Sequence, residues 1–275
     1  MKYLDEQFDL ESPLLVEMLD EVPQWSAPFG QQLLELINYR RNLHVLDVGF
    51  GLGYPLIELA MRLGSSSRVT GIDVWKATIK RTAEKIRYHK LDHINLMECP
   101  AESMPFPDQT FDLVVSNNGI NNVEDQLKVL TECRRVLRPG GQFCFSMNLE
   151  TTMIELYNEL EKAMLKANIP SASELIYHQI YEKRKPLREV KAILQETGFA
   201  IHRLVEDQFS YRFSDGSAMF RHYFIRLAFL EGWKSIVPED KRTLVFSQVE
   251  KQLNQIATKK NGIQLTVPFV VFDCK

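Results

Sequence analysis

The feature that most constrains the fold is a glycine-rich turn that directly follows an apolar run. Residues 45–48 read Val-Leu-Asp-Val, and Gly49, Gly51 and Gly53 follow at alternate positions before a helical pattern begins at Pro55. Glycine lets the main chain turn tightly and approach a ligand without an intervening Cβ. The helix that follows presents unpaired N–H groups towards anionic groups. This order predicts a ligand-binding turn at a strand end; a turn that only reverses the chain is the alternative.

From residue 44 to 147, short β-rich runs alternate with helical patterns. Such alternation predicts right-handed crossovers and a mostly parallel sheet, hence a doubly wound α/β fold. The near-continuous apolar runs FDLVVS and FCFSM favour strands that are buried on both faces. The predicted strands are 44–48, 68–73, 94–98, 111–117, 142–147, 200–205 and 262–272, and the predicted helices between the first five are 55–63, 76–88 and 125–137.

The length of 275 residues suits one domain with added segments. We predict a ligand-binding core over 43–147 and helical insertions at 151–183 and 218–257 that form a substrate cap. Residues 1–42 are predicted to form an N-terminal helical flap.

Two aromatic stretches lie in these added segments. Residues 25–30, Trp-Ser-Ala-Pro-Phe-Gly, are predicted to break helical structure and to form a flap over the ligand, with simple packing as the alternative. In the second insertion Phe220, Tyr223, Phe224 and Leu227 are spaced as one helical stripe, which favours core packing.

Composition excludes several partners. The 33 basic and 36 acidic residues give a formal charge of −3, which offers no electrostatic attraction to a nucleic-acid backbone. None of the four cysteines has CxxC spacing, so neither a disulfide framework nor a metal site is predicted. The acidic segment 1–12 lacks the apolar core of a signal peptide, and no apolar run of about 18 residues is present to cross a bilayer. We therefore expect a cytoplasmic monomer or homodimer with a small-molecule substrate.

A carboxylate follows the second predicted strand. Asp73 stands 20 residues after Gly53 and can accept hydrogen bonds from the two ribose hydroxyls of an adenosine ligand. The alternative role is an N-cap for the helix that begins at Lys76. A dinucleotide fingerprint, GxGxxG, needs its third glycine at residue 54, where this chain has tyrosine. This spacing therefore argues against a dinucleotide ligand, which would be bound through its diphosphate.

Four motifs in this order resemble the class I S-adenosylmethionine-dependent methyltransferases, in the small-molecule branch and similar to the ubiquinone/menaquinone-type enzymes. They are VLDVGFGLG at 45–53, VTGIDV at 69–74, AESMPFPDQTFDLVVSN at 101–117 and RRVLRPGG at 134–141. The resemblance implies a Rossmann-like, seven-stranded sheet with an antiparallel last strand. About 55 residues separate the last two predicted strands, where the family usually has a short turn, and we assign them to substrate recognition.

The resemblance also implies a binding site for S-adenosylmethionine. Asp47 and the glycine loop would hold the methionine end, Asp73 the ribose, and the next two residues the adenine face. Residues 101–102 would meet the adenine edge, and Asn117 would lie near the methionine moiety. The full set is Asp47, Gly49, Gly51, Gly53, Asp73, Val74, Trp75, Ala101, Glu102 and Asn117.

Two departures from the family pattern bear on chemistry. Glu102 replaces the aspartate often found there, and Asn121-Asn122 replaces a His-His pair found in many relatives. Asparagine cannot act as a general base near pH 7, so that role is absent from this pair. Turn formation before the next helix is the favoured role for both asparagines.

The implied reaction is methyl transfer by in-line displacement, with S-adenosylhomocysteine as product. Positioning and exclusion of water are expected to drive it, so no catalytic side chain is required. Candidates for a base or orienting group lie in the added helices: Tyr177, His178, His222 and Tyr223. An NAD-dependent oxidoreductase and a non-catalytic cofactor-binding module of the same fold are the alternatives.

Overall fold

The computed structural model describes residues 2–21 and 24–275, which divide into two compact units. The sheet unit comprises Asp9–Asn148, Leu187–Asp207 and Phe269–Lys275. The helical unit comprises residues 2–8, Leu149–Pro186 and Gln208–Pro268. The segment 1–42, predicted as an N-terminal flap, includes residues 1, 22 and 23, which lie outside the described residues.

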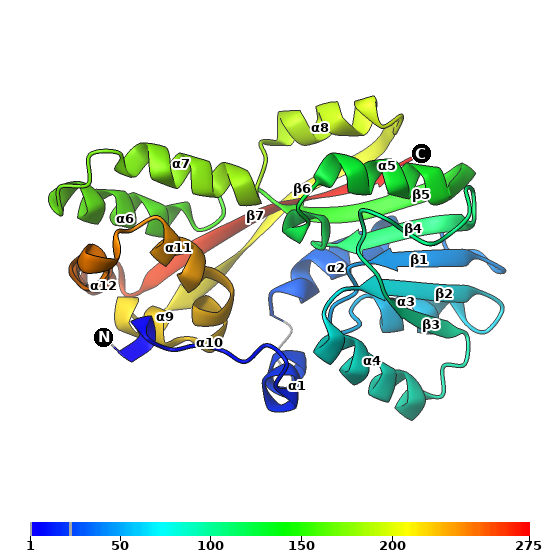
Figure 1. The fold of residues 1–275 in the computed structure, drawn as a ribbon, viewed down its shortest axis with the longest axis horizontal. Coiled ribbons are helices and arrows are strands. Elements are labelled where there is room, and N and C mark those ends of the chain that lie inside the picture. Colours follow the sequence, from blue (N-terminus) through cyan, green and yellow to red (C-terminus); the bar gives the residue numbers. More distant parts are fainter. Residues whose placement is uncertain (1, 22–23) are drawn as a thin grey trace. The chain divides into compact units, whose positions relative to one another are not determined.

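The sheet has seven strands in the order β3-β2-β1-β4-β5-β7-β6 (Figure 1). Neighbouring strands from β3 to β5 are parallel, whereas β7 runs antiparallel to β5. The predicted seven-stranded, mostly parallel sheet with an antiparallel last strand is therefore confirmed. Strand bounds are β1 His44–Val48, β2 Arg68–Asp73, β3 Ile94–Glu98, β4 Phe111–Asn117, β5 Leu137–Asn148, β6 Ile201–Phe213 and β7 Ile263–Cys274.

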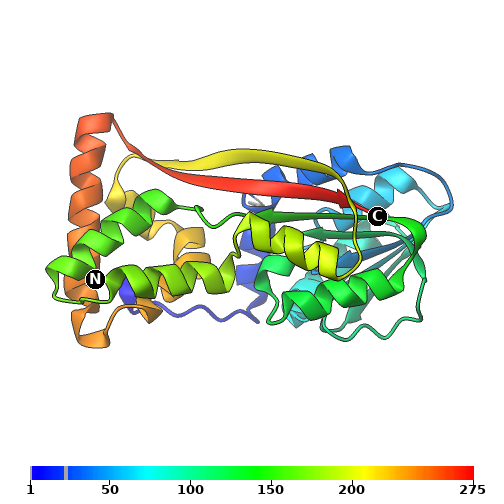
Figure 2. The same ribbon diagram turned by 90° about the horizontal axis from the view of Figure 1, so that it is seen from above.

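Helices lie on both faces of this sheet within the sheet unit (Figure 2). α5 begins where the Asp125 carboxylate accepts a hydrogen bond from the Lys128 N–H at 3.0 Å, and α4 ends at Lys90 in the left-handed conformation. The helices are α1 Pro13–Glu21, α2 Ser26–Leu36, α3 Leu56–Leu63, α4 Lys76–His89, α5 Gln126–Val136 and α8 Leu187–Glu196, with a 3₁₀ turn η2 at Ile120–Asn122.

The apolar strands predicted as buried form the core of this unit. Eight consecutive residues of β5, beginning at Gly141, are buried, as are all but one residue of β4. Aromatic rings stack within and between strands: the Phe145 centroid lies 4.7 Å from that of Phe143 in the same strand and 4.7 Å from that of Phe272 in β7. Each such side chain contributes on the order of 1.5–3 kcal/mol by leaving water. This packing fixes the strand ends that carry the polar residues described below.

The helical unit contains both predicted insertions. α12 packs against α6 and α9, and α6 packs against α7 (Figure 2). The N-terminal 3₁₀ turn joins them, because the ring of Tyr3 stacks on Phe220 at 5.0 Å and its hydroxyl donates to Glu250. The elements are η1 Lys2–Leu4, α6 Ile154–Lys166, α7 Ala172–Lys183, α9 Gly216–Arg221, α10 Tyr223–Ile225, a π-helical turn η3 Arg226–Leu230, α11 Glu231–Ser235, η4 Glu239–Lys241 and α12 Arg242–Lys260.

The predicted break of helical structure at residues 25–30 is wrong, because α2 runs through it. Pro28 is the third residue of α2, where its missing N–H has no intrahelical partner to lose. Phe29 is fully buried against Phe269, with ring centroids 5.0 Å apart. Gly30 leaves room for the ring of Tyr54, which would collide with a Cβ there.

The predicted single stripe through Phe220 and Leu227 is also wrong. The chain leaves the helix at His222, where φ is −68° and ψ is 124°. A π-helical turn then shifts the phase again, so the buried apolar side chains from 219 to 233 are Met219, Phe220, Ile225, Leu230 and Trp233. Residue spacing alone carries no signal for either irregularity.

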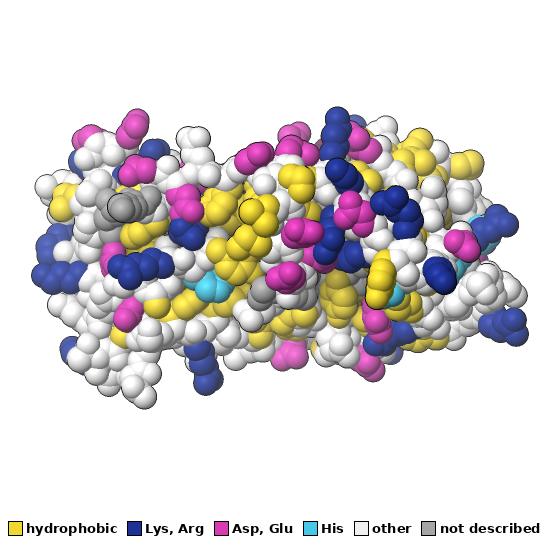
Figure 3. Space-filling view, turned by 90° about the horizontal axis from the view of Figure 1, so that it is seen from below, with side chains coloured by type: hydrophobic (Ala, Val, Ile, Leu, Met, Phe, Trp, Pro, Cys, Tyr) yellow, Lys and Arg dark blue, Asp and Glu magenta, His cyan; other side chains and the backbone are white. Residues whose placement is uncertain are grey.

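Two strands are longer than predicted. β6 extends to Phe213 rather than ending near residue 205, and β5 begins at Leu137, ahead of its glycine pair. Of the helices in the described residues, none combines the length and apolar character that a membrane crossing requires. Basic and acidic side chains lie interspersed on the face shown in Figure 3.

Candidate functional site

The glycine loop joins β1 to α3 at the carboxyl edge of the sheet. Gly49, Gly51 and Gly53 have φ values of 75°, 51° and 86°, a region that other residues rarely adopt. The Gly49 N–H donates to the Ile72 carbonyl at 2.8 Å, which ties the loop to the adjacent strand β2. The predicted strand, turn and helix therefore occur where expected.

The three glycines have different surroundings. A Cβ on Gly53 would lie 2.8 Å from a methyl carbon of Thr82, and one on Gly49 would lie 3.2 Å from the Gly119 backbone. A Cβ on Gly51 would meet no atom of the described residues within 4 Å. Gly49 and Gly53 thus allow neighbouring groups to pack closely against the loop. At Gly51 the main chain faces open space, through which a ligand can approach.

Asp73 ends β2 beside this loop. One carboxylate oxygen accepts the Gly51 N–H at 2.7 Å and the other accepts the Trp75 N–H at 2.9 Å. Asp73 therefore fixes the glycine loop and also supports the start of α4, close to the N-cap role considered as an alternative. Each carboxylate oxygen has a second lone pair, so the group retains acceptor capacity for a ligand.

Asp47, in β1, is a fully buried carboxylate. Neither of its oxygens has a hydrogen-bond partner among the described residues. Burial, and then the nearby charge of Asp73, raise the pKa of Asp47 to about 8. Burying a carboxyl group that receives no hydrogen bond costs folding free energy. A ligand that carries a cation or hydrogen-bond donors would offset this cost.

Asn117 closes the site at the end of β4. Its amide donates to the Ser26 carbonyl at 3.0 Å and accepts from the Ser146 hydroxyl at 2.9 Å. Gly119 follows, and a Cβ there would lie 2.8 Å from the Val48 carbonyl oxygen, so the loops after β1 and β4 pack backbone to backbone.

The asparagine pair has mixed surroundings. Asn122 donates to the Asn118 carbonyl at 3.2 Å, in the manner of a turn. Asn121 donates to the Asn148 carbonyl at 3.2 Å, but its buried Oδ1 has no partner among the described residues. Turn formation thus accounts for Asn122 and leaves one acceptor of Asn121 available.

The predicted adenine-side residues lie on two loops. Val74 is 64% exposed, and the indole N–H of Trp75 donates to the Leu10 carbonyl at 2.8 Å. Ala101 and Glu102 are half-buried, and the Glu102 carboxylate accepts the Glu124 N–H at 3.2 Å. The contacts of these four residues with adenine remain predictions.

A polar brace behind the glycine loop was missed by the sequence analysis. The Lys85 ammonium donates to the Leu52 carbonyl and to Asp20 of α1, the latter at 2.6 Å. The Thr82 hydroxyl donates to the Gly51 carbonyl at 3.3 Å. These residues come from α1 and α4, and no local motif marks them.

The four weak catalytic candidates all belong to the helical unit. Tyr177 is exposed on α7, and His178 beside it lies 3.8 Å from Glu174. His222 and Tyr223 are half-buried among aromatic rings; burial lowers the pKa of His222 and raises that of Tyr223. The Nδ1 of His222 has no partner among the described residues. A catalytic role for any of them remains a prediction.

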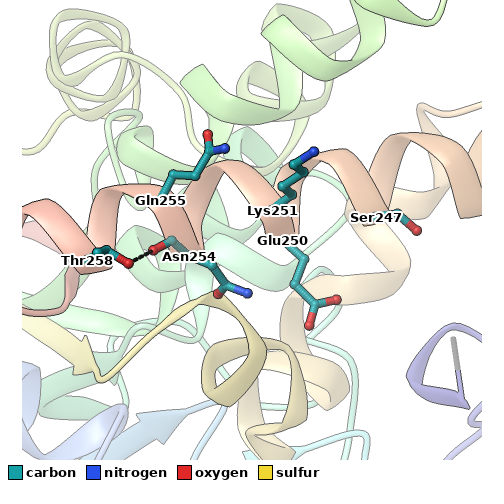
Figure 4. A pocket seen from close by; sticks show the side chains of 6 residues that line it. All are labelled: Ser247, Glu250, Lys251, Asn254, Gln255 and Thr258. Carbon is teal, nitrogen blue, oxygen red and sulfur yellow. Dashed lines mark hydrogen bonds between the residues drawn. The ribbon is translucent and has the colours of Figure 1, made fainter.

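A surface hollow of about 420 Å³ lies along α12 (Figure 4). Its lining groups already serve the helical unit: Glu250 accepts from the Ser217 hydroxyl at 2.6 Å, and Asn254 donates to that hydroxyl at 3.1 Å. These bonds hold α9 against α12. The hollow is therefore a structural feature and not a candidate site.

Gly51→Ala is expected to weaken binding of an adenosyl ligand at least tenfold, because the new Cβ would occupy the open space beside the main chain. The left-handed conformation adds a stability cost of about 1–2 kcal/mol. Gly140→Ala is the matched control, since Gly140 has a φ of 75° and open surroundings but lies at the turn within β5. Titration calorimetry and thermal unfolding of both variants check this. Equal affinities would contradict the role given to Gly51.

Comparison with known proteins agrees with this geometry. Residues 46–145 match the family model described as a methyltransferase domain. The demethylmenaquinone methyltransferase of Anoxybacillus flavithermus is 32% identical over 156 residues, which is 57% of this chain and 65% of that protein. The same-named protein of Listeria welshimeri is 36% identical over 112 residues, 41% of this chain and 48% of that protein. The chain thus spans about half to two thirds of these relatives.

Solved structures show the same fold at low sequence identity. An S-adenosylmethionine-dependent methyltransferase from Aquifex aeolicus superposes with a TM-score of 0.56 at 18% identity, covering 98% of this chain and 99% of that one. The geranyl diphosphate C-methyltransferase from Streptomyces coelicolor, which holds S-adenosylhomocysteine, gives 0.55 at 15% identity, with 93% and 82% covered. The [4+2]-cyclase SpnF gives 0.56 at 17% identity, with 90% and 80% covered.

Residues 46–145 therefore match a methyltransferase domain, and the fold is similar to that of solved S-adenosylmethionine-dependent methyltransferases. The resemblance predicted from the four motifs is confirmed. Within that class, the similarity extends to the demethylmenaquinone methyltransferases, as the ubiquinone/menaquinone-type motifs implied. The comparisons favour neither the NAD-dependent oxidoreductase nor the non-catalytic module.

Proposed function

We propose that this protein binds S-adenosylmethionine in the sheet unit and transfers its methyl group to a small-molecule acceptor. The observation that carries the proposal is the pairing of the open main chain at Gly51 with the buried Asp47 carboxylate, which has no hydrogen-bond partner in the described part of the chain. Asp73 is hydrogen-bonded to that same glycine at 2.7 Å. A ligand with a cationic amino-acid end and a ribose would satisfy both carboxylates.

The residues present fit this cofactor. Asp47 and the glycine loop would hold the methionine end, and Asp73 would accept bonds from the ribose hydroxyls. The half-buried Trp75, together with Val74, would cover the adenine ring, and Ala101 and Glu102 would meet its edge. Asn117 would lie near the methionine moiety. When bound, the cofactor supplies an electrophilic methyl group on a sulfonium that is already an activated leaving group.

The protein's own task is then to hold the nucleophile in line and to exclude water. Correct positioning can contribute roughly 7–11 kcal/mol to lowering the barrier. Water exclusion adds to this because the positive charge disperses in the transition state. Asn121 and Asn122 supply no base. If the nucleophile carries a proton, His222 is the candidate whose lowered pKa keeps the imidazole neutral near pH 7.

The acceptor is proposed to be held by the helical unit, whose insertions 151–183 and 218–257 lie outside the matched segment 46–145. The relatives' name makes a demethylmenaquinone-like quinol the first acceptor to test. The fold alone does not fix the reaction, since a cyclase shares it.

Thermal unfolding with added ligands tests the cofactor assignment. At 100 times its Kd, a ligand of the native state stabilises by about 2.7 kcal/mol. S-adenosylmethionine and S-adenosylhomocysteine are expected to raise the melting temperature, and NAD is not. Incubation with methyl-labelled cofactor and reduced naphthoquinones then tests transfer. A rise with NAD alone, or cofactor binding without label transfer to any small acceptor, would contradict the proposal.

A further inference from the structure

Arg184, at the end of α7, is a buried cation without an acidic partner. Its side chain belongs to a residue only 5% exposed, and no ion pair joins it to any acid in the part of the chain that the structure describes. One terminal nitrogen donates to the Tyr157 hydroxyl at 2.8 Å, while the Nε has no partner within the same described residues. A buried guanidinium normally has a carboxylate or phosphate opposite it, because desolvation of an unpaired charge is costly.

The surroundings hold this guanidinium in a defined position. The Tyr157 hydroxyl donates in turn to Gln179 at 2.6 Å, and the Arg184 guanidinium carbon lies 5.7 Å from the Tyr157 ring centroid. Gln179 is itself confined, since a Cβ on Gly232 of α11 would lie 2.9 Å from its amide nitrogen. Helices α6, α7 and α11 thus converge on one polar cluster.

A second donor without a partner among the described residues lies next to Tyr157. Trp233 is fully buried, its ring meets that of Tyr157 edge-on at 6.4 Å, and its indole N–H has no partner among the residues described. The aromatic surface continues from Trp233 to Phe229 at 5.8 Å and on to Phe224 at 5.9 Å. An aromatic molecule with an oxygen-bearing end would suit these groups, because its oxygen could accept from the two donors and its rings could pack against the aromatic side chains.

The immediate neighbours of Arg184 in the sequence supply no counter-charge. Lys183 and Lys185 flank Arg184, and the Lys185 ammonium lies 4.8 Å from the Tyr181 ring centroid. Among the described residues, no ion pair joins Arg184 to an acidic side chain, and its guanidinium donates to the Tyr157 hydroxyl. An uncharged acceptor would satisfy the indole but would leave the guanidinium uncompensated.

We infer that the helical unit recognises an aromatic monoanion, a carboxylate or a phenolate, whose charged oxygen accepts from Arg184 Nε. The inference rests on the proposed function and names the chemical class of its methyl acceptor. Trp233 and the rings beyond it would then bind the apolar body. The π-helical turn at 226–230 contains Phe229 and lies between Phe224 and Trp233 in the sequence.

Calorimetric titration with 2-naphthoate and its neutral isostere 2-naphthamide tests this on the full chain. The wild type is expected to bind the acid at least tenfold more tightly than the amide. Arg184→Met should reduce that ratio to about one without lowering the melting temperature, because an uncompensated buried charge is removed. Lys185→Met, the matched control, should keep the ratio. A parallel titration with 2-naphthol above and below its own pKa separates phenolate from carboxylate recognition.

The outcomes separate this inference from the proposed function. S-adenosylhomocysteine should bind Arg184→Met as tightly as the wild type, because the cofactor residues lie in the sheet unit. The inference alone is overturned if the wild type binds the cofactor but binds 2-naphthoate and 2-naphthamide equally well. It is likewise overturned if the wild type binds the cofactor but neither naphthalene compound at millimolar concentration. Loss of the preference in Lys185→Met as well would overturn the assignment to Arg184. Failure of the wild type to bind the cofactor instead overturns the proposed function.

Discussion

Replacement of Asp73 by alanine is expected to weaken binding of S-adenosylhomocysteine by about 100-fold or more. Hydrogen bonds to a charged acceptor contribute about 1.5–3 kcal/mol each, so losing two ribose contacts removes at least about 3 kcal/mol. The variant also releases the Gly51 N–H, which Asp73 now accepts at 2.7 Å, and so loosens the loop that holds the methionine end. Titration calorimetry at pH 7.5 measures the change directly.

Asp112→Ala is the matched control for this experiment. Asp112 also accepts a backbone bond, from His44 at 2.9 Å, and pairs with Arg138 at 2.8 Å, but it lies at the start of β4 and not at its carboxyl end. This variant should lose stability and keep cofactor affinity within about twofold. Wild-type affinity in Asp73→Ala, or an equal loss in Asp112→Ala, would remove the ribose role from Asp73.

Asp47 is expected to make the stability of the ligand-free protein fall as pH rises. Its folded pKa of about 8 stands above the ordinary value of 3.8, so between these values the folded state binds more protons than the unfolded state. The contribution is therefore fully present below about pH 4 and lost as pH rises through about 8, with a slope of up to about 1.4 kcal/mol per pH unit. Asp47→Asn should lack this slope, as urea unfolding at pH 5, 6 and 7 can measure.

Cofactor binding should reverse that behaviour. A cationic ligand favours the ionised form of Asp47, so ligand binding near pH 6.5 is expected to release close to one proton. The affinity is therefore expected to increase up to tenfold for each pH unit as the pH rises towards about 8. Titrations in buffers of different ionisation enthalpy count that proton. Proton release by Asp47→Asn equal to that of the wild type would show that Asp47 does not titrate with the ligand.

Much of the sheet unit was predictable because its signals are local. The runs that became β1 and β4 are apolar almost without interruption, as strands buried on both faces must be, and the three alternate glycines fix the turn between β1 and α3. The position of Asp73 follows from the same logic, because carboxyl ends of adjacent parallel strands meet at one edge. The antiparallel β7 came from the family resemblance, since residue patterning does not reveal direction.

The remaining features depend on contacts between distant segments. The Lys85 brace joins α1 and α4 through Asp20, and nothing near either residue in the sequence indicates the pairing. Gly30 appeared to break a helix, whereas its role is to accommodate Tyr54. In the helical unit, the break at His222 and the π-helical turn after it shift the buried face away from the predicted stripe. Arg184 is noticed only once its burial and its missing counter-charge are known.

A crystal structure of the protein with S-adenosylhomocysteine tests the central claim most directly. We expect both ribose hydroxyls within about 2.5–3.2 Å of the Asp73 carboxylate. The ligand should run along the main chain at Gly51 with its amino group directed to Asp47. A ligand bound elsewhere, or an Asp73 carboxylate turned away from the sugar, would contradict the account.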